Sequence, residues 1–193
     1  MSKVNKTNIL LDLDNTLISS ISPDEERKVY KSRMKKFRWE DMEGEYKVFE
    51  RPDLQPFLDF LFQNFNVSVW TAASKTYASF IIDRFILKGH PERKLHYIFF
   101  SYHCKLSKKI KTTQKSLDLL SQYFKLADFK NDTYIIDDHP EVFRAQPDRC
   151  IAVKPFEFTE RQSFNDRELE NVQKHLRTYL DRTTKNVTNL KKS

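Results

Sequence analysis

Residues 8–17 read NILLDLDNTL, an apolar run that gives way within a few positions to acidic and polar side chains. A short, almost continuous apolar run of this kind is typical of a strand that is buried on both faces of a parallel sheet. We therefore predict a strand over Asn8 to Leu13, with Asp12 and Asp14 at its carboxyl end.

Four further apolar runs have the same character and lie between segments with helical spacing. The predicted strands cover residues 66–70, 96–100, 133–136 and 150–153. The predicted helices cover residues 54–65, 77–85, 116–124 and 165–180. Strands that alternate with helices predict an α/β fold with an open, three-layer parallel sheet. In such sheets ligands bind beyond the carboxyl ends of the strands.

The stretch from Ser19 to Glu50 breaks this alternation. It is strongly charged up to Lys36, and two apolar-rich segments then flank Glu43 and Gly44. Gly44 suits the turn of a β-hairpin because glycine accepts backbone angles that other residues avoid. We interpret residues 19–50 as a small flap within one domain of residues 1–182, followed by a polar C-terminal tail of residues 183–193.

The composition agrees with one globular domain that attracts anions. The 193 residues are 39% hydrophobic and 13% aromatic, and the formal net charge is +7. A basic chain favours anionic partners, either nucleic acid or phosphorylated protein. Several of the lysines crowd residues 105–115, which we interpret as a Lys-rich loop.

The cysteines and the apolar runs indicate the cellular compartment in which the protein is expected. Cys104 and Cys150 fit neither a disulfide framework nor a metal-ligand spacing, so we expect packed, reduced thiols. The N-terminal residues lack the apolar core of a signal peptide, and no apolar run is long enough to span a membrane. We expect an intracellular protein of the cytoplasm or nucleus with no membrane partner.

Acidic and hydroxyl side chains follow three of the predicted strands. Asp12 and Asp14 end the first, Thr71 follows the second, and Asp137 and Asp138 end the fourth. Because parallel strands end at one edge of the sheet, these groups are expected to converge. Clustered carboxylates are costly unless a cation or a lysine neutralises them, and Mg²⁺ prefers such oxygen ligands.

The motifs resemble those of the haloacid-dehalogenase superfamily. Asp12-Leu13-Asp14-Asn15-Thr16-Leu17 resembles its DxDxT(L/V) signature, and the chain is most similar to its FCP/SCP-like (NIF-like) phosphatases of the RNA polymerase II C-terminal domain. Glu50-Arg51-Pro52, Val69–Ser74 and Ile135–Pro140 resemble further segments of that family. The resemblance runs from about Ile9 to Leu180, and it implies a Rossmann-like core with a small hairpin insertion and no large cap domain.

The resemblance also implies roles for the acidic residues. Asp12 would be the nucleophile that forms an aspartyl-phosphate, and Asp14 would protonate the leaving oxygen and later take a proton from water. Mg²⁺ would be held by the side chains of Asp12 and Asp138 and by the backbone carbonyl of Asp14.

The same family resemblance implies that neutral and basic groups bind the phosphate. Thr71 and the backbone N–H of Ala72 would hold phosphoryl oxygens, and a lysine oriented by Asp137 would offset their charge. Lys115 fits that lysine best. Competing candidates are Lys105, Lys108, Lys109 and Lys111.

Two segments give less information about function: the one that follows the third predicted strand, and the Arg51-Pro52 pair. Members of the family commonly have an arginine after the third strand, whereas Phe99 to Cys104 contains none, which leaves the grip on the substrate open. We interpret Arg51 and Pro52 as the start of a helix and nothing more.

Three functions remain as hypotheses. The favoured one is a Mg²⁺-dependent phosphatase acting on phosphoserine or phosphothreonine in proteins, because a flap without a cap leaves the site open to a peptide. The +7 charge prompts the same chemistry on nucleic-acid or nucleotide phosphates. The third is a non-catalytic module that binds phosphoproteins.

Overall fold

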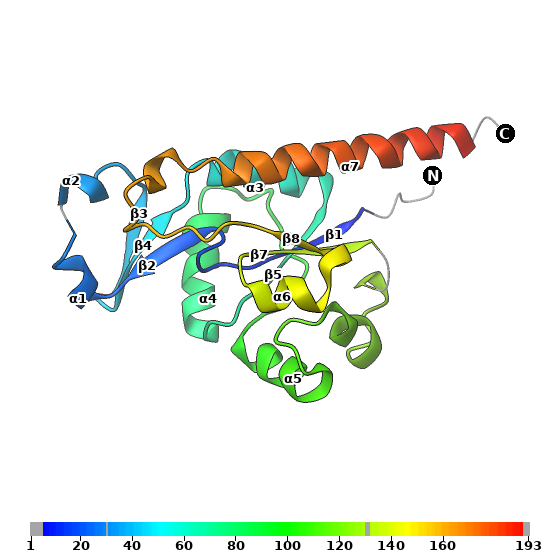
Figure 1. Ribbon diagram of the computed structural model, residues 1–193, viewed down its shortest axis with the longest axis horizontal. Helices are drawn as coiled ribbons and strands as arrows, with labels where there is room; N and C mark the ends of the chain where they lie inside the picture. The colour runs from blue at the N-terminus through cyan, green and yellow to red at the C-terminus, as the bar shows by residue number, and fades with distance from the viewer. Residues whose placement is uncertain (1–5, 30, 130–131, 191–193) are drawn as a thin grey trace.

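The computed structural model describes the backbone of residues 6–29, 31–129 and 132–190; the side chains of residues 128 and 181–190 are outside that description. Its main sheet has five parallel strands in the order β6-β5-β1-β7-β8 (Figure 1). These are β1 (Asn8–Leu11), β5 (Asn66–Trp70), β6 (Ile98–Phe99), β7 (Thr133–Asp137) and β8 (Cys150–Ala152). Each lies where a strand was predicted, and the α/β fold with a parallel sheet is confirmed.

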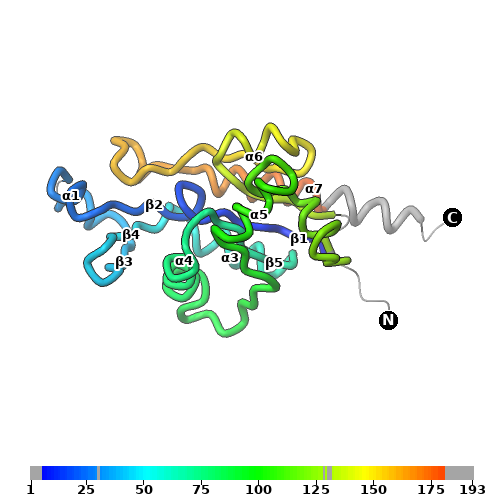
Figure 2. Tube along the Cα trace, turned by 90° about the horizontal axis from the view of Figure 1, so that it is seen from below, coloured from blue at the N-terminus to red at the C-terminus, as the bar shows by residue number. Residues whose placement is uncertain are grey.

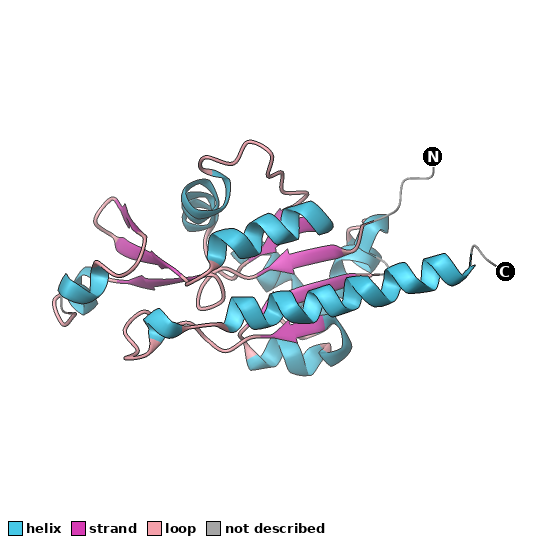
Figure 3. Cartoon of the chain, turned by 90° about the horizontal axis from the view of Figure 1, so that it is seen from above, coloured by secondary structure: helices cyan, strands magenta, loops and turns pink. Residues whose placement is uncertain are grey.

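Helices cover both faces of this sheet. Along β1, Ile9 and Leu11 point into the core beneath α3 (Leu54–Asn64) and α7 (Glu168–Leu190), which lie over one face in Figure 3. Leu10 points to the opposite core, under α5 (Ser101–Lys111) and α6 (Pro140–Ala145), which lie nearer the viewer in Figure 2. A central strand that is buried on both faces explains why residues 9–11 are apolar at consecutive positions.

The flap is a separate antiparallel sheet of three strands in the order β2-β4-β3. It consists of β2 (Ile18–Ile21), β3 (Trp39–Met42) and β4 (Tyr46–Glu50), with the short helices α1 (Pro23–Glu26) and α2 (Lys31–Met34) between the first two strands. The hairpin turns at Gly44, whose φ of 80° lies in the left-handed region that favours glycine. The predicted hairpin is therefore present, with β2 as an additional strand.

The Lys-rich segment is a helix over most of its length, and our interpretation of it as a loop was wrong. Residues 101–111 form α5, and its buried side chains are Cys104 and Ser107. Both are small and one is polar, so the helix lacks the repeating large apolar residues that reveal a helix in a sequence. The lysines lie on its outer surface and on the turn that follows.

Three other helices differ from the prediction in form or length. Helix α4 (Lys75–Ile81) continues into a π-helical segment, Ile82–Leu87, and a second π-helical segment, Leu119–Tyr123, lies within the helix expected over 116–124. Helix α7 was expected to end at Leu180 but continues to Leu190, because no glycine or proline follows to end it. The predicted polar tail is thus helical at the backbone up to Leu190, and residues 191–193 lie outside the described residues, as do residues 1–5.

The segment between β8 and α7 returns to the flap and joins the two sheets. Phe158 stacks on Phe49 of β4 with ring centroids 3.6 Å apart, and its backbone N–H donates to the hydroxyl of Ser19 at 3.0 Å. Arg33 of α2 donates to the Phe158 carbonyl at 2.8 Å. The flap is therefore held at a fixed place beside the carboxyl ends of the sheet. Among the described residues, no helix combines the length and the apolar content that a bilayer crossing requires.

The two cysteines are buried, and their burial predicts low reactivity. Burial raises the pKa of Cys104 to about 11 and that of Cys150 to about 12. At pH 8 the reactive thiolate is then scarce, so native protein should gain almost no iodoacetamide label over an hour. Intact-mass measurement checks this, with urea-unfolded protein as the control that should take two labels. A native protein that labels as fast as the unfolded chain would contradict the packing described.

Candidate active site

The predicted site residues meet at the carboxyl edge of the main sheet. Register is the cause: Leu11 of β1 is level with Val69 of β5 and with Ile136 of β7, so the residues that follow them lie side by side. The backbone N–H of Asp12 still donates to the Ile136 carbonyl at 3.0 Å, which fixes the start of the loop. A cavity of about 150 Å³ opens there, lined by Asp12, Asp14, Asn15, Thr71, Ala72, Gln114, Lys115, Asp138, His139 and Val142.

Lys115 forms the centre of the site. Its side chain is 4% exposed, and its Nζ lies 2.6 Å from Asp12 Oδ1 and 2.8 Å from Asp137 Oδ2. Burial alone would lower the pKa of Lys115, but the two carboxylates outweigh burial and hold that pKa above its ordinary value. The ammonium is therefore charged at neutral pH.

The turn that carries Lys115 is held from both sides. The Gln146 side chain donates to the Lys115 carbonyl at 2.8 Å and accepts from the Leu117 N–H at 3.1 Å. The Ser107 hydroxyl of α5 donates to the Thr113 carbonyl at 2.7 Å and accepts from the Ser116 N–H at 3.0 Å.

The competing lysines lie elsewhere. Lys105, Lys108 and Lys109 are exposed on α5, and none of the three forms an ion pair with a described residue. Lys111 donates to the Gln122 side chain at 2.5 Å. Among the candidates from the Lys-rich segment, Lys115 is the one whose ammonium reaches the acidic cluster.

Asp137 is fully buried and commits both carboxylate oxygens to protein donors. Oδ2 accepts from Lys115, and Oδ1 accepts from the backbone N–H of His139 at 2.8 Å. Burial raises the pKa of Asp137 and the nearby Asp12 carboxylate adds to the rise, while Lys115 opposes it. This geometry suits a residue that orients the lysine.

The acidic cluster fits a hard divalent cation. Oxygen atoms of Asp12, Asp137 and Asp138 all lie within 4.8 Å of one another. Since Asp137 is engaged on both oxygens, Asp12 and Asp138 are the side chains that could hold Mg²⁺, which prefers carboxylate oxygen. The Asp14 side chain lies outside this cluster, so a metal role for Asp14 falls to its backbone carbonyl, as the resemblance implies.

Asp14 lies in a different environment from Asp12. Its Oδ1 accepts from the hydroxyl of Tyr77 at 2.5 Å. Burial raises the pKa of Asp14 to about 6, against the opposing effect of that hydrogen bond. Asp14 can therefore carry a proton close to neutral pH, whereas Asp12 faces an ammonium.

Two residues of this network, Tyr77 and Thr16, had no assigned role in the sequence analysis. Tyr77 was one of the regularly spaced apolar residues of a helix; Ser74 caps that helix by accepting from the Tyr77 N–H at 3.2 Å. The Thr16 hydroxyl contacts Asp138 Oδ1 at 3.0 Å and Asp12 Oδ2 at 3.4 Å. The signature motif named Thr16, but its sequence position gave no partner.

Thr71 lies at the end of β5 and faces the cavity. Its N–H donates to the Phe99 carbonyl at 3.0 Å, and its hydroxyl oxygen accepts from the Ala73 N–H at 3.1 Å. The hydroxyl proton is then available to a ligand in the cavity.

Arg51 does more than begin a helix, so our narrower interpretation was wrong. Its guanidinium is fully buried and pairs through two nitrogens with both carboxylate oxygens of Asp166, each at 2.9 Å. It also donates to the Thr16 carbonyl at 2.8 Å and to the Lys154 carbonyl at 2.9 Å. The partners lie up to 115 residues away, which is why the sequence gave no sign of them.

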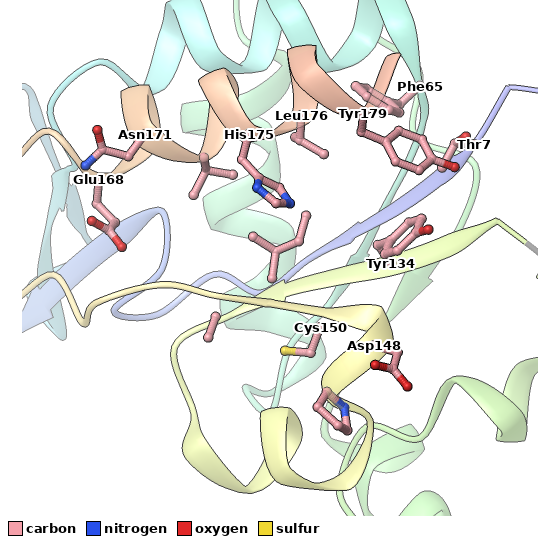
Figure 4. Close-up of a pocket in the computed structure, with 14 residues that line it drawn as sticks. Thr7, Phe65, Tyr134, Asp148, Cys150, Glu168, Asn171, His175, Leu176 and Tyr179 are labelled. Atoms are coloured by element: carbon pink, nitrogen blue, oxygen red, sulfur yellow. The ribbon is translucent and has the colours of Figure 1, made fainter. Parts of the chain in front are cut away.

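Two further cavities have different relations to the site. A groove of about 430 Å³ between the flap and α4 shares Asp14 with the site and is lined also by Ser20, Met42, Glu45, Tyr46, Ala73, Ser74, Thr76 and Tyr77. A cavity of about 450 Å³ lies between α7 and strands β7 and β8, where His175 and Tyr179 face Cys150 and Tyr134 (Figure 4). None of the acidic cluster lines that second cavity, so it is not part of the site.

Known proteins of similar sequence and structure point to one family. The family model for NLI interacting factor-like phosphatases matches residues 7–188. A protein of Invertebrate iridescent virus 6 named "Putative CTD phosphatase-like protein 355R" is 46% identical over 180 residues, covering 90% of this chain and 99% of that protein. Its namesake in Invertebrate iridescent virus 3 is 44% identical over 186 residues, covering 93% and 100%.

Solved structures show the same fold. The fission yeast RNA polymerase II CTD phosphatase Fcp1, in a variant bound to beryllium fluoride, superposes with a TM-score of 0.56 at 23% identity, covering 92% of this chain. A second structure of Fcp1, an essential RNA polymerase II CTD phosphatase, gives 0.53 at 19% identity and covers 90%. This chain spans 51% and 49% of those two chains, about half their length. The family model and the viral relatives establish that this chain belongs to the NLI interacting factor-like phosphatases.

Proposed function

We propose that this chain is a Mg²⁺-dependent phosphatase that hydrolyses phosphoserine or phosphothreonine in proteins through an aspartyl-phosphate on Asp12. The observation that carries the proposal is the contrast between two aspartates of one loop. Asp12 lies 2.6 Å from the Lys115 ammonium, while Asp14 is partly buried beside the neutral hydroxyl of Tyr77. One is suited to remain an anion and the other to carry a proton.

The first half of the reaction cleaves the phosphate ester. A carboxylate oxygen of Asp12 attacks phosphorus, the bond to the ester oxygen breaks, and Asp14 gives its proton to that oxygen as it leaves. Thr71 and the N–H of Ala72 hold the transferred phosphoryl group, and Lys115 offsets its charge. The products of this step are a free hydroxyl on the substrate and phosphorylated Asp12.

The second half regenerates the enzyme. Asp14, now a carboxylate, takes a proton from a water molecule whose oxygen attacks phosphorus, and the bond to Asp12 breaks to release inorganic phosphate. Asp12 and Asp138 would hold Mg²⁺, which would supply positive charge to offset that of the phosphoryl group. Asp137 takes no part in bond changes and holds Lys115 in place.

A protein substrate is favoured by the shape around the site. The flap leaves a groove of about 430 Å³ that leads to Asp14, and Tyr46 of the flap packs edge-on against Tyr77 with centroids 5.7 Å apart. A groove of that kind admits an extended peptide that continues on both sides of the phosphorylated residue. The viral relatives are named as CTD phosphatase-like proteins, which supports a phosphoprotein substrate.

Replacing the nucleophile tests the chemistry. Asp12→Asn should lower the hydrolysis of an aryl phosphate and of a phosphopeptide by at least about a thousandfold, because the amide cannot form the covalent intermediate. Phosphate release measures turnover, and mass spectrometry of acid-quenched wild-type protein should find the phosphoryl group on the peptide that contains Asp12. Asp83→Asn, an exposed control, should keep wild-type rates. Undiminished turnover in Asp12→Asn would remove the mechanism.

Replacing lysines one at a time tests the assignment of Lys115. Lys115→Met should lower kcat by about 10²–10³, the usual loss when one preorganised group that stabilises developing charge is removed. Lys108→Met, on the exposed surface of α5, should change kcat by less than about twofold. Both are compared by phosphate release below the variant's melting temperature, since removing a buried charge partner costs about 3–5 kcal/mol of stability. A large loss in Lys108→Met with full activity in Lys115→Met would reverse the assignment.

The second candidate substrate is a nucleic-acid phosphate, which the exposed lysines of α5 favour. Lys105, Lys108 and Lys109 form a basic surface with no acidic partner among the described residues. At about 150 mM salt, we expect kcat/KM to be higher for a phosphoserine peptide than for 3′- or 5′-phosphorylated oligonucleotides. If an oligonucleotide is the better substrate and its kcat/KM falls steeply with salt, the protein-substrate proposal fails.

A further inference from the structure

Two buried arginines, Arg51 and Arg93, form hydrogen bonds to segments that are distant in sequence, and Arg51 lies next to the site. Arg51 follows β4, and its five N–H groups have acceptors on Asn15, Thr16, Lys154 and Asp166. The Arg51 guanidinium also lies 5.5 Å from the centroid of the Phe156 ring. It therefore connects the base of the flap, the loop after β1 and the segment before α7.

The loop that Arg51 contacts carries strain that the surrounding chain must hold. Asn15 has a φ of 57°, in the left-handed region that non-glycine residues seldom adopt. Its carbonyl accepts from the Phe156 N–H at 2.6 Å and from Arg51 at 3.5 Å. Contacts from residues far along the chain thus select this loop conformation.

Thr16 transmits the arrangement to the acidic cluster. Its carbonyl accepts from Arg51 at 2.8 Å, and its hydroxyl contacts Asp138 at 3.0 Å and Asp12 at 3.4 Å. Because carbonyl and side chain belong to one residue, a shift of its backbone would move the hydroxyl between the two carboxylates.

We propose that Arg51, oriented by Asp166, is a positioning residue that sets the spacing of Asp12 and Asp138 through Asn15 and Thr16. Asp166 is the partner that fixes the guanidinium, since it binds two of its nitrogens; its Oδ1 also accepts from the Glu168 N–H at the start of α7. The inference rests on the proposed function for its catalytic meaning, but its effects on Mg²⁺ affinity and on the protection of the loop can be measured without turnover.

Arg93 offers a matched comparison. Its side chain is also fully buried, and it donates to Asp59 at 2.7 Å, to Gln55 at 2.9 Å and to the Ile86 carbonyl at 2.8 Å. These partners lie on α3 and the π-helical segment after α4, with no contact to the acidic loop. Loss of Arg93 should lower stability as loss of Arg51 does, while leaving the site unchanged.

The experiment compares Asp166→Asn and Arg51→Lys with Asp59→Asn and Arg93→Lys. In Asp166→Asn an amide NH₂ replaces one of the two accepting oxygens, so two donors would face each other at one guanidinium nitrogen. In Arg51→Lys the single ammonium cannot reach all the acceptors that the guanidinium reaches. Calorimetry gives the Mg²⁺ Kd, and hydrogen exchange with mass spectrometry gives the protection of residues 13–18, both below the lowest melting temperature of the set.

We expect the Asp166 and Arg51 variants to raise the Mg²⁺ Kd and the Mg²⁺ concentration for half-maximal aryl-phosphate hydrolysis by about 10–100-fold. Exchange at residues 13–18 should be at least about tenfold faster in the same variants. The Asp59 and Arg93 variants should stay within about twofold of wild type in all three measurements. Asp166→Asn with wild-type Kd and wild-type exchange at that loop would overturn the inference, and so would an equal effect in Arg93→Lys.

Failure of the proposed function would look different. If wild-type protein hydrolyses neither aryl phosphate nor phosphopeptide, the phosphatase proposal falls, while the Kd and the exchange rates still decide the role of Arg51. The exchange measurement needs no metal, so it decides the matter even for protein that binds Mg²⁺ weakly.

Discussion

The buried contact of Lys115 with Asp12 and Asp137 is the interaction on which the site depends. Parallel strands in register bring three carboxylates to within 4.8 Å, and like charges at that separation in a poorly solvated place repel strongly. One ammonium, 2.6 and 2.8 Å from two of them, compensates that repulsion. The two aspartates that share the ammonium also differ. Asp137 accepts hydrogen bonds on both oxygens, whereas Asp12 lines the cavity and its second oxygen has only a long contact, 3.4 Å from the Thr16 hydroxyl.

A second constraint comes from the order of the chain. The loop after β1 lies between the flap and the segment that follows β8, so it contacts both Arg51, before α3, and Phe156, before α7. Phe156 and Arg51 hold the strained Asn15, and the stacked rings of Phe158 and Phe49 hold the flap above it. Residues of the segment before α7 therefore support the loop at the site, although none of that segment lines the site cavity.

The sequence predicted the sheet and most of the acidic site, for an identifiable reason. Strands buried on both faces are short apolar runs, and the residue after each run falls at the sheet edge, so Asp12, Thr71 and Asp137 could be located without coordinates. Helix α5 was not predicted because its buried residues, Cys104 and Ser107, do not form a pattern of large apolar side chains. Strand β2 was not predicted because its two isoleucines, Ile18 and Ile21, are three apart and break the two-residue period of a strand. These failures are of local pattern.

The other failures concern partners. The sequence could not separate Lys115 from the four competing lysines, because burial depends on how the whole chain folds. The hydroxyl of Tyr77 and the guanidinium of Arg51 bind aspartates that lie 63 and 115 residues away in the sequence. Even so, the spacing of the acidic motif has a local explanation. Leu13 is fully buried in the core, and the aspartates on either side of it both line the cavity. Two carboxylates from one short segment then enter different surroundings, one beside an ammonium and one beside a phenol. A carboxylate beside a cation and a carboxyl beside a neutral donor can therefore lie two residues apart, because the leucine between them points into the core.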